Sequence, residues 1–181
     1  MSHITRYDQM PIPPIEAHTE YFEAGAVRFG VEYRLLNDAI AAASATESAS
    51  GSDTATGLDF GDDRGVSIHV FVRDGDEWLE HLRFDCFDED PHYHYVCWAA
   101  RSNEMIHIDP IADGDPLAWA LERLHSRLLQ MLERAGAKDV AARLDPGAIG
   151  SALPRVAEAA YRARYHHDDP ATLAGALAGD R

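Results

Sequence analysis

Between residues 66 and 110, short hydrophobic runs alternate with polar turns. The runs are rich in Val, Ile, Phe, Tyr and Trp, the turns contain Asp, Gly, Pro and Asn, and the runs cover 66–74, 78–87, 92–100 and 104–110. This pattern is typical of an antiparallel meander. Residues 21–36 are aromatic and β-branched, with glycines at 25 and 30, and add one bent strand or a short hairpin. We therefore predict a sheet of five to six strands.

The chain after residue 114 has a helical pattern instead. Asp115 and Pro116 provide an N-cap and a first helical position. Apolar residues then recur at helical spacing as far as Gly136, at Leu117, Leu121, Leu124, Leu128 and Met131. A second helix is predicted from Ser151, and a third from Asp169 through Leu177. Strands followed by helices indicate an α+β fold, with about three helices on the apolar face of the sheet.

The domain organisation follows from length and local composition. A chain of 181 residues suits one domain with a substantial core. Residues 1–18 include the proline-rich stretch PIPPIEAH and are predicted to form an extended N-terminal arm. Residues 19–181 are predicted to form a single α+β domain. Within it, a tract of Ser, Thr and Ala predicts a flexible loop at about 42–64.

Charge and composition exclude several functional classes. The chain carries 31 acidic and 16 basic residues, a net charge of −15, which repels nucleic acid and anionic lipid; we expect neither as a partner. No basic region followed by an apolar one opens the chain, no apolar run approaches about 20 residues, and the two cysteines are not expected to be cross-strand partners that could form a disulfide. These features predict a cytoplasmic protein. No phosphate loop or dinucleotide fingerprint occurs, so no nucleotide cofactor is expected.

The stretch RFDCFDEDPHYHY, residues 83–95, holds the candidate site. Alternation along two strands places His81, Arg83, Asp85, His92 and His94 on one face, which we expect to be exposed. The apolar and cysteine side chains between them point to the other face, under the helices. In the predicted hairpin, Asp85 lies opposite His94.

A metal ion is the first interpretation of this face. His92 and His94 form a His-x-His pair on a strand, so both imidazoles can reach one divalent ion. A third ligand would come from Asp85, His69 or His107. Zinc or iron suits such ligands, and an open position would hold water for chemistry on a small molecule, including hydrolysis.

Other interpretations remain open. In metal-free acid–base chemistry, Asp85 would orient His94 and Arg83 would bind a small anionic substrate, which makes Asp85 and Arg83 the candidate catalytic residues. In a purely structural interpretation, the same groups form ordinary cross-strand pairs. The rival functional class is a non-catalytic accessory subunit or dimerisation module of a metabolic complex. There the patch and Trp98 would contact another protein or a second copy of the chain.

Two resemblances bear on these alternatives. The stretch RFDCFDEDPHYHY, with GVSIHVF upstream, resembles an uncharacterised bacterial domain family over about residues 20–160. That resemblance implies a bacterial cytoplasmic origin and no particular activity. RFD followed by PHYH also resembles a strand pair of small bacterial toxin proteins of toxin–antitoxin systems, with Phe84 where those proteins have tyrosine. A toxin–antitoxin component is thus a further alternative.

Overall fold

The computed structural model describes residues 4–40, 43 and 63–168. They build one antiparallel sheet of seven strands in the order β1-β7-β6-β5-β4-β3-β2. The strands are β1 (Ile4–Tyr7), β2 (Thr19–Ala24), β3 (Val27–Leu35), β4 (Arg64–Asp74), β5 (Glu77–Phe87), β6 (His92–Cys97) and β7 (Ser102–His107). The antiparallel α+β prediction is confirmed, but five to six strands was wrong. Residues 4–7 add a strand, and a turn at Gly25, with φ of 68°, divides residues 21–36 into two.

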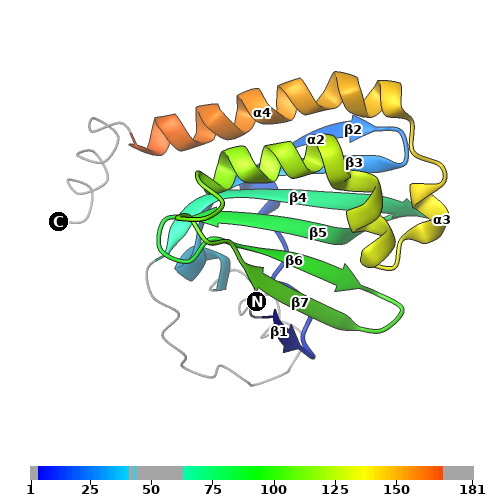
Figure 1. The fold of residues 1–181 in the computed structure, drawn as a ribbon, viewed down its shortest axis with the longest axis horizontal. Helices are drawn as coiled ribbons and strands as arrows, with labels where there is room; N and C mark the ends of the chain where they lie inside the picture. The colour runs from blue at the N-terminus through cyan, green and yellow to red at the C-terminus, as the bar shows by residue number, and fades with distance from the viewer. Residues whose placement is uncertain (1–3, 41–42, 44–62, 169–181) are drawn as a thin grey trace.

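The longer helices cover one face of this sheet (Figure 1). They are α2 (Pro116–Arg134) and α4 (Pro146–Asp168), with the short α3 (Lys138–Ala141) between them; residues 36–40 are also helical, and η1 (Glu16–His18) is a single 3₁₀ turn. Asp115 caps α2 as predicted, because its carboxylate accepts a 2.8 Å hydrogen bond from the amide of Ala118. α4 begins five residues before the predicted start at Ser151. None of the helices in the described part has the length and apolar character needed to cross a membrane.

For two predicted segments, the structure gives no description or only a partial one. The predicted helix after Asp169 lies outside the described residues, and so does most of the predicted loop at 42–64.

The hydrophobic core lies between the helices and the sheet. Phe29, Ile68 and Phe84 come from three adjacent strands, are fully buried, and face Leu124 of α2 and Val156 of α4. Burying a side chain of this size stabilises the fold by about 1.5–3 kcal/mol. Because side chains alternate along a strand, this burial assigns every second residue to the opposite face.

That opposite face is crossed by the segment between β1 and β2. Since these strands occupy the two edges of the sheet, residues 8–15, which we call the strap, run across the back of the sheet in Figure 1. The carbonyl of Ile12 accepts hydrogen bonds from Arg83 (2.6 Å) and Arg34 (3.0 Å). Proline has no backbone N–H, so a strap with three prolines offers mainly carbonyls, which suits a face rich in arginine donors.

The connection between β5 and β6 is longer than predicted. Asp85 pairs with His92 rather than with His94. The carboxylate of Asp63 accepts hydrogen bonds of 3.1 and 2.9 Å from two backbone amides in the turn at residues 88–91, which stabilises the wider turn. The partner of Asp85 changes by two residues, so the side chains stay on the predicted faces.

A β-bulge places His81 on the helical face of the sheet, opposite to the face that we predicted. The β4–β5 register shifts between Val70 and Phe71, and His81 is the extra residue of β5. Its Nδ1 lies 3.2 Å from the carbonyl oxygen of Ala135 at the end of α2, on the helical side. Burial there lowers the pKa of His81. Glu80 takes the place on the polar face instead.

Candidate metal centre

The polar face is buried, which corrects the expectation that it is exposed. The exposed fractions are 3% for Arg83 and Asp85, 7% for His94 and 0% for His69. The strap covers these groups from the side opposite the helices. Ionised groups at such positions require partners, because the cost of removing an isolated charge from water is several kcal/mol or more.

Asp85, His92 and His94 form the one group of potential metal ligands in the described residues, with one ligand atom from each within 4.8 Å of the others. The two imidazoles project from the same side of β6 because they are two residues apart. Asp85 reaches them from β5. Its Oδ2 lies 3.4 Å from the Nε2 of both His92 and His94. In a tetrahedral site with bonds of about 2.0–2.1 Å, neighbouring ligand atoms are about 3.3–3.4 Å apart.

The other ring nitrogen of each histidine has an acceptor. Nδ1 of His92 lies 2.7 Å from the backbone oxygen of Asp90, and Nδ1 of His94 lies 2.7 Å from Oδ1 of Asn103. These oxygens can only accept, so Nδ1 carries a proton in each ring. Nε2 is the nitrogen that faces Asp85: it donates to the carboxylate when the ring is protonated, and in the neutral ring it has the lone pair that a metal ion would bind. Histidines that bind metals ordinarily have their other nitrogen held in this way.

The carboxylate is also oriented. The hydroxyl of Ser67 donates to Asp85 Oδ1 at 2.5 Å, which leaves Oδ2 for the histidines. Burial alone would raise the pKa of Asp85, but hydrogen bonds from His92 and His94 and the charge of Arg83 hold that pKa well below its usual value. Asp85 is therefore an anion at neutral pH, as a metal ligand must be. The pKa of His92 is raised: burial opposes its charged form, but Asp85 outweighs burial.

His69 lies in a second buried cluster, not with the histidines of β6. Its Nδ1 is 2.6 Å from Glu80 and its Nε2 is 3.3 Å from Glu32. Arg83 donates to both oxygens of Glu80, from Nε at 2.9 Å and from Nη2 at 2.6 Å. Burial by itself raises the pKa of Glu80, yet the charges of Arg83 and His69 lower it to about 2. Arg83 thus connects this cluster to Asp85.

His107, the other candidate third ligand, is also engaged elsewhere. Its Nδ1 lies 2.6 Å from the carboxylate of Asp90, at a partly exposed position beside the hairpin turn. Its ring centroid is 6.4 Å from that of His92. Of the candidate third ligands, the structure brings only Asp85 together with His92 and His94.

A cavity of about 330 Å³ adjoins the cluster and is lined by Arg34 and Arg83 as well as by Asp85, His92 and His94. Its other walls include apolar side chains from the strap and the sheet, among them Met10, Ile12, Phe87 and Met105. A concave site with apolar walls and a few convergent polar groups is the usual form of a small-molecule site.

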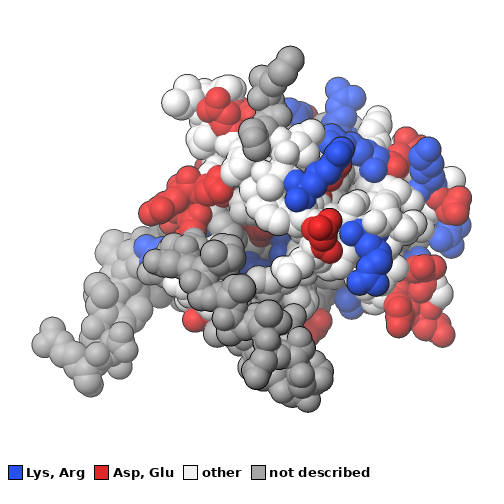
Figure 2. Space-filling model, turned by 90° about the horizontal axis from the view of Figure 1, so that it is seen from below, with Lys and Arg blue, Asp and Glu red and all other residues white. Residues whose placement is uncertain are grey.

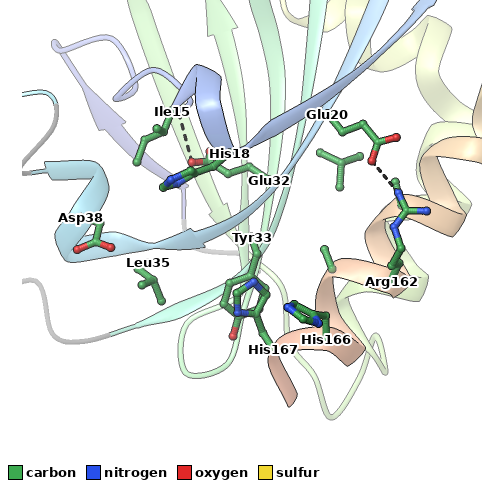
Figure 3. Close-up of a pocket in the computed structure, with 13 residues that line it drawn as sticks. Ile15, His18, Glu20, Glu32, Tyr33, Leu35, Asp38, Arg162, His166 and His167 are labelled. Carbon is green, nitrogen blue, oxygen red and sulfur yellow. Dashed lines mark hydrogen bonds and ion pairs between the residues drawn. The ribbon is translucent and has the colours of Figure 1, made fainter. Parts of the chain in front are cut away.

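A larger cavity, of about 530 Å³, lies where β3 extends past the start of β2, beside the last turns of α4 (Figure 3). Its walls include His18, His166 and His167, but among the residues described no three potential metal ligands meet there. Glu32 contributes to its wall and also contacts His69, so this cavity borders the second buried cluster. His69, Glu80 and Arg83 themselves do not line it.

Several groups of the polar face were not identified from the sequence. Glu32 and Arg34 alternate with apolar residues of β3, and Ser67 alternates with those of β4, so period-two alternation could have placed all three. Glu80 could not be found in this way, because the bulge at His81 breaks the alternation. The contribution of the strap carbonyls has no local sequence signal.

The fold and the site together define the class: an α+β protein with a candidate two-histidine, one-carboxylate centre beneath an N-terminal strap. A family model described as Domain of unknown function (DUF7700) matches residues 21–160, and the chain belongs to that family. The resemblance to an uncharacterised domain family is thereby confirmed, whereas the toxin resemblance receives no support. No curated protein and no solved structure matched the chain.

Proposed function

We propose that the protein binds a divalent metal ion through Asp85 Oδ2, His92 Nε2 and His94 Nε2. The observation that carries this proposal is the convergence of these atoms while Nδ1 of each histidine is held by an oxygen acceptor. An ordinary cross-strand salt bridge requires only one pair of opposite charges. Here two imidazole nitrogens and a carboxylate oxygen converge on one another. Each of the three side chains is oriented by a further hydrogen bond, to the backbone of Asp90, to Asn103 or from Ser67.

Zinc or iron is the proposed ion, and the spacing favours zinc. Two imidazoles and one carboxylate suit either metal. The 3.4 Å separations match the edge of a tetrahedral zinc site, whereas an octahedral ion with bonds of similar length needs about 2.9 Å.

The number of ligands and the cavity support small-molecule chemistry rather than a structural ion. Structural zinc sites ordinarily have four protein ligands, and sites with three keep a position for water or substrate. Here that position would face the cavity. A divalent ion there supplies a water molecule of lowered pKa, near 7, suited to hydrolysis.

Arg83 and Arg34 would favour a small anionic substrate, because both line the cavity. Arg83 would act by its charge and its position rather than as a two-point clamp, since Nε and Nη2 both bond to Glu80. In this proposal Asp85 is a ligand, and the catalytic role considered for it in metal-free chemistry is not needed.

Metal analysis of protein purified without a histidine tag tests the proposal. We expect about one equivalent of zinc or iron per chain. The metal is then removed with a chelator and added back. At a free metal concentration about 100 times the dissociation constant, the ion should raise the free energy of unfolding by about 2.7 kcal/mol, which corresponds to a rise in Tm of about 5–10 °C.

The variant for this test is His92→Ala/His94→Ala, and His125→Ala/His166→Ala is its matched control at two exposed positions. The first pair should lose the metal and the thermal shift, and the second should keep both. If neither zinc nor ferrous iron changes the Tm of the metal-free wild-type protein, the proposal is wrong.

A further inference from the structure

A further cleft lies on the helical side of the sheet, between α2 and β6. It has a volume of about 290 Å³, and its principal lining residues are Tyr93, Tyr95, Trp119, Arg123, Arg127 and Arg134. Tyr93 and Tyr95 alternate with His92 and His94 along β6, so they point away from the candidate metal centre. The cleft is therefore separate from that centre and independent of the function proposed for it.

The lining of this cleft is basic in a strongly acidic chain. Three arginines and no acidic residue line it, although the chain carries 31 acidic residues against 16 basic ones. The arginines lie four and seven residues apart along α2, which places them on one side of the helix. Seen from below, most basic side chains gather on one part of the surface, with acidic side chains among them (Figure 2).

The aromatic side chains hold two of the arginines. The guanidinium of Arg134 lies 4.0 Å from the ring centroid of Tyr95, and that of Arg123 lies 4.9 Å from the ring centroid of Trp119. Arg134 also bonds to Glu104 at 3.3 Å. Arg127 takes part in none of the ion pairs found among the described residues. Arg123 is paired with Glu122 and Arg134 with Glu104, so Arg127 is the arginine of this cleft whose charge is available to a ligand.

Trp119 lines the cleft with its ring. Its indole N–H is buried and has no acceptor within the described part of the chain, a condition that it shares there only with Nε of Arg28. Because this N–H is closed to solvent, the case for a ligand rests on the arginines and the aromatic rings.

We propose that this cleft binds a small organic anion, namely a planar ring that carries a phosphate or a carboxylate. Guanidinium groups bind such anions and also stack on aromatic rings, so the arginines suit both parts of the ligand. A volume of about 290 Å³ lies at the lower end for ligand sites and fits one ring with one anionic group rather than a polymer.

Titration of the metal-free protein with phenyl phosphate tests this proposal, with phenol and inorganic phosphate as the two halves of the probe. Calorimetry gives the affinities, and tryptophan fluorescence, to which Trp119 contributes with Trp78 and Trp98, gives a second signal. Phenyl phosphate should bind at least about 10-fold more tightly than either half, because ring and anion contribute together. Equal binding of phosphate alone, or no saturable binding, would overturn the proposal.

Matched variants locate the binding. Arg127 is exposed, so Arg127→Gln should fold normally and weaken phenyl phosphate binding about 10-fold, whereas Arg143→Gln, at another exposed position, should leave that binding unchanged. His92→Ala/His94→Ala should also bind the probe normally. Loss of binding in that double variant, or unchanged binding in Arg127→Gln, would overturn the assignment to this cleft without affecting the proposed metal centre.

Discussion

The ring of His94 is oriented by Asn103: its Nδ1 lies 2.7 Å from the carboxamide oxygen on the neighbouring strand β7. The amide nitrogen of Asn103 in turn lies 3.4 Å from the carbonyl oxygen of Gln9 in the strap. The carboxamide must therefore present its oxygen to His94 and its nitrogen to Gln9. Because that oxygen accepts a hydrogen bond from Nδ1, Nε2 is the ring nitrogen that faces Asp85 and would bind the metal ion.

Removal of this acceptor should weaken metal binding. Groups that orient metal-binding histidines typically contribute 10–100-fold to affinity, so Asn103→Ala should lower zinc affinity by about that factor. Asn103→Asp keeps an oxygen acceptor and should retain most of it. Competition with a chelator measures both affinities. Equal zinc affinity in the Ala variant and the wild-type protein would show that the contact does not orient a ligand.

Ser67 should act in the same way on Asp85. Ser67→Ala removes the hydroxyl that holds Oδ1, so we expect a lower zinc affinity and a loss of about 1–3 kcal/mol in unfolding free energy. Ser126→Ala is the control, because that serine bonds to Glu122 on the exposed side of α2. Urea unfolding and zinc titration should separate the two variants; an unaffected Ser67→Ala would mean that Asp85 needs no such support.

Glu80 should make stability depend on pH in acid. Its pKa falls from 4.5 to about 2 in the folded protein, so its contribution is complete above about pH 4.5 and is lost as the pH falls toward 2. The shift corresponds to about 3 kcal/mol. Glu80→Gln also leaves Arg83 buried without its partner and should cost about 3–5 kcal/mol at pH 7.

Urea unfolding of this variant at pH 7 and pH 3 checks the argument. The difference from the wild-type protein should shrink at the lower pH, because at pH 3 Glu80 is protonated in the unfolded wild type but still mostly ionised in the folded one, so that its contribution to stability is partly lost. Glu77→Gln, an exposed position on the same strand, should show almost no difference at either pH. A Glu80→Gln difference that stays constant across this range would contradict the assigned pKa.

Gly65 should be the least replaceable glycine of the sheet. A Cβ at this position would lie 2.4 Å from the carbonyl oxygen of Cys86 on β5, in backbone that cannot move aside cheaply. Gly65→Ala should therefore destabilise the β4–β5 pair, which carries Asp85, by about 2 kcal/mol or more. Gly75→Ala meets no atom within 4 Å and has only its φ of 61° to oppose it, about 1–2 kcal/mol. Thermal unfolding of the two variants should rank them in this order.

Alternation along β5 and β6 was enough to place Asp85, His92 and His94 on one face, even though the predicted register differed by two residues. A period of two tolerates an even error. The same logic failed at His81, because a bulge adds one residue and reverses the faces beyond it. A bulge is defined by the pairing with the partner strand, so it cannot be predicted from the sequence of one strand alone.

Burial of the polar face was the larger miss, and its cause is non-local. Arg83 and Arg34 look like solvent-facing residues within their own strands. What covers them comes from Ile12, about 70 residues before Arg83 in the sequence. The strand pattern predicts which side chains share a face; it does not predict whether a distant segment covers that face.

The position of β1 has a consequence for how the chain is made. Its pairing partner is β7, so Ile4 cannot meet Ile106 until about one hundred further residues have been synthesised. Contacts between such distant segments form late and slowly, since a long loop must close first. Until β7 has been synthesised, a nascent chain therefore has no partner for β1, and Arg34, Arg83 and Asp85 of the polar face lack a strap that is anchored at both edges of the sheet.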